Sequence, residues 1–208
     1  MIAQDNKVEL LGTYGSDETH ALSAWTSTSR DLPEEKRKRI PVLLKMLAEN
    51  GHHSVFEKSS LHFLVTSEIA THIQVIKHRS GTSCNTESAR YKELKDNKVY
   101  TPQDWPKDEQ EKYIQFMENA LKQYHETLER LVKSGMDRKR AKESARFYIP
   151  YGNQVTYDLM FNFRSFNHFL SLRMKNDAQR EICWLAEKML DLVKGSKQFE
   201  HTLAAFGY

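Results

Sequence analysis

The chain has 208 residues, of which 39% are hydrophobic and 28% charged, a composition typical of a soluble globular domain and not of a disordered chain. A formal net charge of +3 is too small to favour binding to duplex DNA. No apolar run approaches the length of a membrane span, and the N-terminus shows no signal pattern. The two cysteines form no disulfide framework. We therefore expect one domain over residues 1–208 in the cytoplasm of a cell, or of the host if the protein is viral.

The first half of the chain carries signals for two strands and three helices. Ser16 is typical of an N-cap, Pro41 should kink or restart a helix, and Gly51 should end it. Leu61, Phe63 and Val65 alternate with polar residues, as in a half-buried strand. The expected elements are a strand over 7–14, helices over 17–29 and 33–50, a strand through residues 61–65, and a helix over 68–78 that carries Lys77 and His78 at its C-terminal end.

The second half contains the longest helical pattern, which runs from Trp105 to Ser134 and ends at Gly135. Four further elements are expected after it: a helix over 137–147, a strand over 155–163, and helices over 165–174 and 177–192. Helical patterns outnumber strand patterns, so the predicted fold class is α+β, with more helix than strand.

The most informative segment is residues 77–91, a polar cluster directly after an apolar helical pattern. Lys77 and Arg79 supply positive charge, and residues 80–83 offer hydroxyl and backbone donors. Asn85 and Glu87 could bind the edge of a base or a ribose. A phosphate-bearing ligand would suit such a cluster, although most mixed polar loops are solvated surface. Taken alone, the segment predicts an anion or nucleotide site.

Three separated segments resemble the flavin-dependent thymidylate synthases, and the resemblance covers nearly the whole chain. They are residues 51–57 (GHHSVFE), 74–91, and 145–182, the last including Ala145-Arg146, Asn162-Phe163-Arg164-Ser165, His168-Phe169 and Leu172-Arg173. The middle segment is similar to the family signature of Arg-His-Arg, seven residues and Ser.

This chain departs from the family pattern at three places. Lys77 replaces the first signature arginine, which keeps the charge but loses the planar fork. Eight residues separate Arg79 from Ser88, so either Thr86 or Glu87 could take the place of the family's glutamate. Asp177 stands where the family often has histidine.

The resemblance implies a helix-rich single domain around a small, mostly antiparallel sheet. It implies reductive methylation of dUMP to dTMP, with methylenetetrahydrofolate as carbon donor, FAD as hydride carrier and NADPH as reductant. It also implies a homotetramer with flavin sites between subunits, and neither a nucleic acid nor a membrane as partner.

The resemblance assigns site residues by position. Arg173 matches the catalytic arginine that stabilises negative charge on the pyrimidine, whereas by sequence alone it could be a helix C-terminal cation. The dUMP-binding set is Gln74, Lys77, Glu87, Ser88, Ala89, Arg90, Arg146 and Arg173. The FAD-binding set is Ser54, Lys77, His78, Arg79, Glu87, Asn162, Phe163, Arg164 and His168.

Other functions remain open from the sequence. The family departures also allow a different C5 modification of a pyrimidine nucleotide, such as hydroxymethylation. The basic loop alone would fit a non-catalytic nucleotide- or RNA-binding module. Cys84 near His78 could be a nucleophile, whereas Cys183 fits a helix core. The histidine spacings match no compact ligand pattern, so no metal site is predicted.

Overall fold

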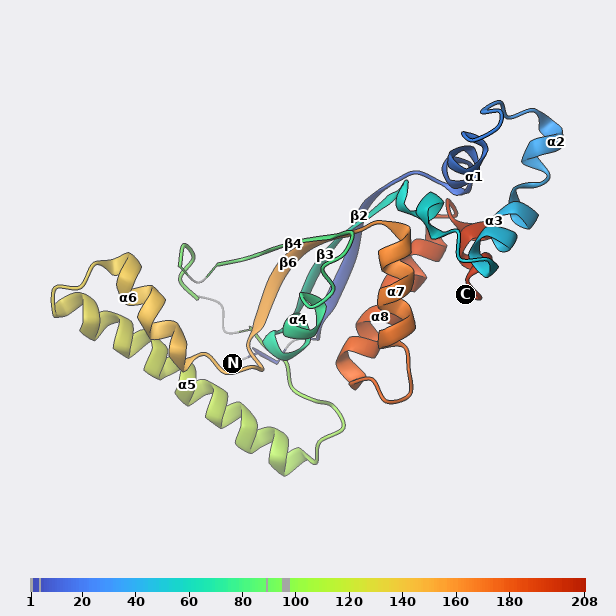
Figure 1. Cartoon of the computed structure of the whole chain (residues 1–208). Helices are drawn as coiled ribbons and strands as arrows, with labels where there is room; N and C mark the ends of the chain where they lie inside the picture. Colours follow the sequence, from blue (N-terminus) through green and yellow to red (C-terminus); the bar gives the residue numbers. More distant parts are fainter. Residues whose placement is uncertain (1, 4, 89, 95–97) are drawn as a thin grey trace. The chain divides into compact units, whose positions relative to one another are not determined.

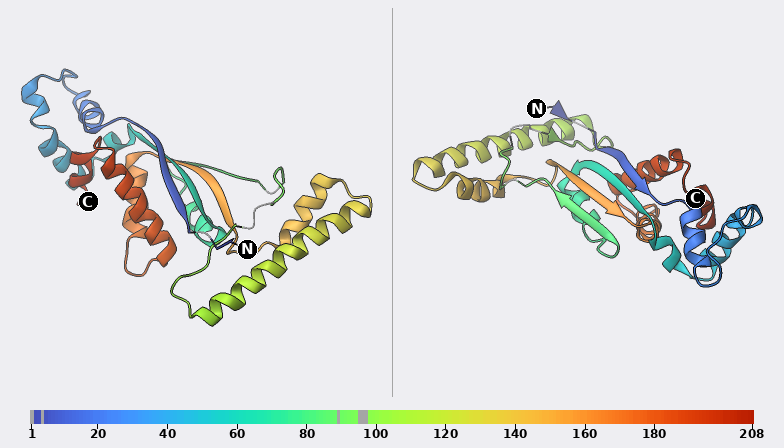
Figure 2. Two further views of the ribbon diagram at one scale, coloured as in Figure 1. Left: turned by 180° about the vertical axis from the view of Figure 1, so that it is seen from behind. Right: turned by 90° about the horizontal axis from the view of Figure 1, so that it is seen from above.

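The computed structural model describes residues 2–3, 5–88, 90–94 and 98–208 (Figures 1 and 2). It contains helices and a four-stranded sheet of order β2-β3-β6-β4, which confirms the predicted α+β class. The chain divides into two compact units. Unit 1 comprises Met1–Lys7, Val65–Gln74 and Asn85–Tyr157, and unit 2 comprises Val8–Leu64, Val75–Cys84 and Asp158–Tyr208. The four strands pass through both units, and the expectation of one domain over 1–208 stays a prediction.

The N-terminal part of unit 2 follows the expected order of elements. They are β2 (Lys7–Tyr14), α1 (Asp17–Trp25), α2 (Glu34–Arg37), α3 (Ile40–Glu49), the 3-10 helix η1 (His53–Glu57) and β3 (Ser60–Glu68). Ser16 caps α1 as predicted, because its hydroxyl accepts a hydrogen bond from the Thr19 amide. The predicted 33–50 helix is divided between α2 and α3, and Pro41 lies in the first turn of α3, where its missing N–H is harmless.

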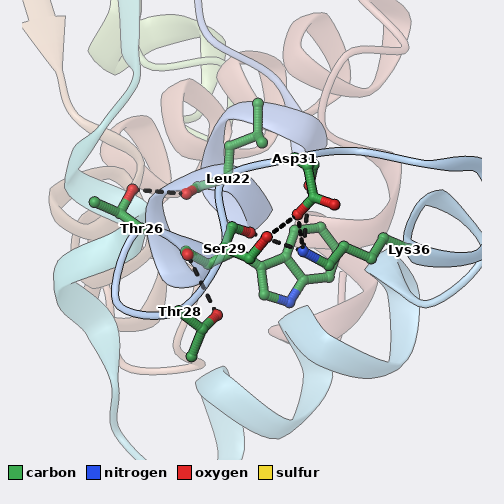
Figure 3. A network of polar contacts seen from close by, with 7 residues as sticks. Leu22, Thr26, Thr28, Ser29, Asp31 and Lys36 are labelled. Atoms are coloured by element: carbon green, nitrogen blue, oxygen red, sulfur yellow. Dashed lines mark hydrogen bonds and ion pairs between the residues drawn. The ribbon is translucent and has the colours of Figure 1, made fainter.

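Helix α1 was predicted to reach residue 29 but ends at Trp25, where hydroxyl side chains donate to its last carbonyls in addition to the backbone amides. The Thr26 hydroxyl donates to the Leu22 carbonyl at 2.9 Å, and Thr28 donates to that of Trp25 at 3.3 Å (Figure 3). Such bonds compete with helix propagation. The loop is then closed by Lys36, which pairs with Asp31 and lies 5.3 Å from the centroid of the Trp25 ring.

The core of unit 2 is an aromatic layer between the sheet and two helices. Helices α7 (Phe163–Arg173) and α8 (Arg180–Gly195) lie side by side against the sheet (Figure 1). Phe166 of α7 stacks on Phe63 of β3, and Phe166 and Phe169 both contact Phe161 of β6 (Gln154–Phe161). All four rings are fully buried. This packing fixes α7, which supplies several predicted site residues.

A buried chain of hydrogen bonds joins α1, the start of β3 and α9 (Glu200–Ala205) within unit 2. The Thr202 hydroxyl donates to Asp17 Oδ1 at 2.6 Å, so its oxygen accepts from His20 Nδ1 at 2.9 Å. His20 Nε2 is then left to accept from the Ser59 hydroxyl at 2.9 Å. Burial lowers the pKa of His20 to about 4, which keeps the imidazole neutral at physiological pH.

Unit 1 is built around an antiparallel helix pair, α5 (Lys107–Lys133) and α6 (Arg138–Ala145), visible in both views of Figure 2. Tyr124 and Leu128 of α5 are fully buried with Ala141 and Ala145 of α6. The remaining elements are α4 (Ile69–Val75), β4 (Thr82–Thr86), the 3-10 helix η2 (Arg146–Tyr148), and the parallel pair β1 (Ile2–Ala3) and β5 (Lys98–Val99).

Three differences from the sequence prediction bear on the site. The helix expected over 68–78 ends at Val75, so Lys77 and His78 lie in the loop that follows. Part of the expected polar loop is the strand β4, which pairs with β6 at the edge of the sheet. Helix α9 was not predicted. Across the described residues, no helix combines the length and apolarity needed to cross a membrane.

Candidate active site

The loop of residues 76–81 is bonded to the N-terminus of α7, which places the signature residues beside that helix. The side-chain oxygen of Asn162 caps the helix by accepting from the Ser165 backbone amide at 2.8 Å. The backbone amide of Asn162 donates to the Gly81 carbonyl at 3.0 Å. The Ser165 hydroxyl donates to the Ser80 carbonyl at 2.6 Å. Loop and helix N-terminus therefore form one hydrogen-bonded assembly.

Gly81 makes this close approach possible. Its φ is +62°, a left-handed conformation that side chains disfavour. A Cβ at this position would lie 2.3 Å from Asn162 Nδ2 and 2.4 Å from Ser165 Oγ. No residue with a Cβ fits here without moving the cap of α7.

Two adjoining cavities open at this assembly and share Ser80, Ser165 and His168. The first has a volume of about 350 Å³ and is lined by the shared residues together with Lys77, His78, Arg79, Thr82, Leu172 and Arg173. The second, of about 660 Å³, is lined by the shared residues together with His53, Glu57, Gly81, Asn162, Arg164, Asn167 and Ser171. The structure thus brings together seven predicted site residues: Lys77, His78, Arg79, Asn162, Arg164, His168 and Arg173.

The smaller cavity is strongly electropositive. Its described lining contains lysine, arginine and histidine side chains but no carboxylate. Within the described part of the chain, neither Lys77 nor Arg79 forms an ion pair. Uncompensated cations beside hydroxyl donors and a helix N-terminus favour an anionic ligand.

His78 and Arg173 form the central contact of the smaller cavity. Arg173 Nε donates to His78 Nε2 at 3.0 Å. Burial, with smaller effects from Arg173 and His168, lowers the pKa of His78 to about 4. The pKa of Arg173 is lowered by burial as well. The pair is therefore a neutral imidazole accepting from a guanidinium.

Three predicted cofactor residues, Ser54, Phe163 and Glu87, lie outside the cavity linings. Ser54 is exposed on η1 and lines neither cavity. Phe163 is fully buried in the aromatic core, where it contacts His20, Phe166, Phe199 and Phe206. The Phe163 side chain packs in this core, so only the backbone of Phe163 can contact a ligand at the N-terminus of α7.

The predicted dUMP residues outside the 77–79 signature and Arg173 fall in unit 1. Arg90 Nε pairs with Glu143 Oε1 at 2.6 Å, and this contact raises the pKa of Arg90. The Arg90 amide donates to the Ser88 hydroxyl at 3.2 Å, and Arg146 is exposed on η2. Gln74 lies near the end of α4. Ala89 lies outside the described residues.

The carboxylate of Glu87 is engaged by the neighbouring strand. Its Oε1 accepts from the Thr156 amide at 2.9 Å, and its Oε2 lies 3.4 Å from Lys92 Nζ. Thr86, the other candidate for the family's glutamate position, has its hydroxyl 2.8 Å from His72 Nε2. A ligand bound by Glu87 would compete with a backbone amide.

The structure adds residues that sequence reasoning did not single out. Ser165 was in the recognised segment, and its position three residues after Asn162 is a capping signal that could have identified it. Glu57 pairs with Arg164 at 2.6 Å, and Glu143 orients Arg90. No sequence signal links those two pairs. Among the described residues, no group of three or more His, Cys, Asp or Glu could hold a metal ion.

Comparison with known proteins identifies the family. The model of the family described as "Thymidylate synthase complementing protein" matches residues 9–196. A flavin-dependent thymidylate synthase of Streptomyces avermitilis is 30% identical, over 97% of this chain and 91% of its own length. The chain belongs to the flavin-dependent thymidylate synthase family.

Further relatives agree with this membership. The flavin-dependent thymidylate synthase of Pseudothermotoga lettingae is 31% identical over 84% of this chain and 79% of its own. Among solved structures, a UMP/dUMP methylase from Streptomyces cacaoi bound with 5-Br dUMP matches with a TM-score of 0.80 and 28% identity, covering 98% of this chain and 95% of that one. The same methylase bound with 5-Br UMP matches with a TM-score of 0.78 and 29% identity.

Proposed function

We propose that this protein converts dUMP to dTMP by reductive methylation at C5 of the uracil ring. The balanced reaction consumes methylenetetrahydrofolate, NADPH and a proton, and yields dTMP, tetrahydrofolate and NADP⁺. The observation that carries the proposal is the electropositive cavity that gathers Lys77, His78, Arg79 and Arg173 in a chain of this family.

The residues at the two cavities fit FAD. A pyrophosphate needs cations and N–H or O–H donors without opposing carboxylates, and Lys77, Arg79, Ser80 and the N-terminus of α7 offer that set. The tight approach at Gly81 leaves backbone close to the ligand. We infer that Lys77, His78, Arg79, Asn162, Arg164 and His168 hold the cofactor, with Ser54, Glu87 and the backbone of Phe163 as further contacts. When bound, FAD supplies the hydride that completes the methyl group.

Arg173 is proposed as the catalytic residue. Methylation requires an electron-rich C5, which develops when negative charge accumulates on the N3–O4 edge of the uracil. A guanidinium stabilises that charge and stays protonated throughout, and it can span two ring atoms with parallel hydrogen bonds. Its place in the partly buried cavity strengthens the electrostatic effect, because less water screens it.

We propose that Ser88 and Arg90 bind the dUMP phosphate, with Gln74, Glu87, Ala89 and Arg146 as further dUMP contacts. Glu143 occupies Arg90 Nε, which holds the guanidinium in one orientation for a bidentate phosphate contact. These residues belong to unit 1, whereas the flavin set apart from Glu87 belongs to unit 2. In the homotetramer that we propose, the two sets need not meet within one chain.

The proposal is tested with purified protein reconstituted with FAD. We expect a yellow protein that retains FAD through gel filtration and forms dTMP only with dUMP, methylenetetrahydrofolate and NADPH all present. A colourless protein that does not retain FAD would refute the proposal. Formation of 5-hydroxymethyl-dUMP in place of dTMP would favour the alternative C5 modification.

UMP is a second candidate substrate, because the structurally similar Streptomyces cacaoi methylase was solved with both 5-Br dUMP and 5-Br UMP. The same assay decides between them when dUMP and UMP are compared at equal concentration. Methylated UMP formed at a rate comparable to dTMP would extend the substrate class to ribonucleotides.

A further inference from the structure

We propose that His78 is a positioning residue for Arg173: its Nε2 anchors Arg173 Nε and so fixes the plane of the guanidinium that faces the pyrimidine. The role of Arg173 at the pyrimidine rests on the proposed function, whereas the anchor itself rests on the contact between the two side chains. This assigns His78 a task in addition to cofactor contact.

The hydrogen bond determines the tautomer of His78. An arginine guanidinium carries only donors, so the 3.0 Å contact from Arg173 Nε requires a lone pair on His78 Nε2. The proton of the neutral ring must then be on Nδ1. The ring is itself held by an edge contact with Phe169, whose centroid lies 5.1 Å away and which is fully buried. A rigid core aromatic therefore supports the acceptor.

The surroundings of His78 keep this acceptor available. The charged and titratable groups of the cavity lining are Lys77 and Arg79 on its own loop, and Arg173 and His168 on α7. None of them favours a protonated imidazole, and the pKa of His78 is held at about 4, mainly by burial. At neutral pH the ring therefore remains an acceptor for Arg173.

Anchoring Nε matters because a guanidinium is planar. With Nε bound to a fixed ring, rotation about the last side-chain bonds is restricted, and the plane containing both Nη groups is set. Bidentate recognition of two ring atoms depends on that plane. Without the anchor Arg173 keeps its charge but samples more orientations, and small misplacements in an active site lower rates strongly.

A double-mutant cycle tests the proposal in the FAD-reconstituted enzyme. His78→Leu removes the acceptor, whereas His78→Gln can place its amide oxygen near the position of Nε2. We expect His78→Leu to lower dUMP-dependent kcat about 10- to 100-fold, and His78→Gln to recover most of it. In an Arg173→Ala background, the same His78→Leu change should alter kcat less than about 2-fold, because its target is absent.

Two results of this cycle would overturn the proposal. One is an equal loss from His78→Leu in both backgrounds, which would mean that His78 acts independently of Arg173. The other is a His78→Gln enzyme as slow as His78→Leu when both are saturated with FAD, which would mean that an acceptor at this position does not matter to Arg173.

Nitrogen NMR of ¹⁵N-histidine-labelled protein without FAD provides a readout independent of activity. His78, assigned by the loss of its signals in His78→Gln, should show a protonated Nδ1 and an unprotonated Nε2. The tautomer ratio should shift in Arg173→Ala. If the wild-type protein showed no dUMP-dependent turnover, the proposed function would be refuted, but the NMR result would still test the hydrogen bond between His78 and Arg173. A protonated Nε2, or an unchanged tautomer ratio in Arg173→Ala, would refute that hydrogen bond.

Discussion

Acidification should destabilise this protein through His20, whose neutral ring links Ser59, Thr202 and Asp17 in the interior of unit 2. Its pKa is about 4 in the folded chain, against an ordinary value of 6.5. Between these two pH values the unfolded chain binds more protons at this position, so the free energy of unfolding falls as the pH falls. The contribution is complete above about pH 6.5 and no further loss occurs below about pH 4.

The magnitude follows from the difference between the two pKa values. With the folded value near 4 and the unfolded value at 6.5, the loss amounts to about 2 kcal/mol at pH 5 and about 3 kcal/mol at pH 4. This is a large part of the stability of a typical domain. The network ties α9 to α1 and to the start of β3, so the segment holding η1 and Glu57 should loosen with it.

The assay is urea unfolding followed by tryptophan fluorescence, at a series of pH values from about 7.5 to 4. His20→Gln is the matched control, because its amide can both donate and accept but does not titrate. The pKa values of His72 and His78 are also lowered, mainly by burial, and both residues remain in the control. The difference between the two pH profiles therefore isolates His20. Parallel profiles for wild type and His20→Gln would refute the reasoning.

Three further predictions concern the site. Arg173→Ala should fold and retain FAD but lose about 10²- to 10³-fold in dUMP-dependent turnover. Arg173→Lys should recover little of this turnover, because a point charge cannot replace a planar guanidinium. Near-normal turnover of Arg173→Ala with an intact flavin spectrum would contradict the assignment. Gly81→Ala should lower the thermal midpoint and weaken FAD binding, because its Cβ would meet Asn162 at 2.3 Å. Gly135→Ala is its control, since Gly135 also has a positive φ, +93°, but nothing within 4 Å of its Cβ position, so equal effects of both changes would exclude the clash. Cys84→Ser should keep most turnover, although the Cys84 side chain is exposed; activity lost with an intact flavin spectrum would instead support a cysteine nucleophile.

The elements that the sequence predicted well are those whose pattern is set by a local period or by a special residue. Leu61, Phe63 and Val65 are fully buried on one face of β3, as their alternation predicted. The helix break near Pro41 was confirmed because a proline lacks an N–H wherever it occurs. Such signals need no knowledge of the rest of the chain.

Other elements depend on partners far away in the sequence. Strand β4 is made of polar residues at the edge of the sheet, and only its pairing with β6 makes it a strand. The helix expected to reach residue 78 ends at Val75 although its local pattern continues. Tertiary contacts overrode local preference in both places.

The same limit applies to the site. The sequence indicated which residue types gather around an anion, and the family resemblance supplied their roles. It could not indicate that Arg173 donates to His78 or that Glu143 holds Arg90, because 95 and 53 positions separate these pairs. Only the docking of the 76–81 loop onto α7 brings the first pair together, and that docking depends on Gly81.

The extra residue between Arg79 and Ser88 shows how a small change in spacing acts through a strand. Side chains alternate between the two faces of a strand, so one inserted residue reverses the face of every residue after it unless a loop absorbs it. Here the Thr86 hydroxyl contacts His72 of α4, whereas the Glu87 carboxylate turns back to the Thr156 amide of β6. Spacing alone therefore left two candidates for one ligand position, and the structure gives both of them partners inside the protein. Whichever of them binds a ligand must exchange that partner for it, so this part of the site should differ most from the family's pattern.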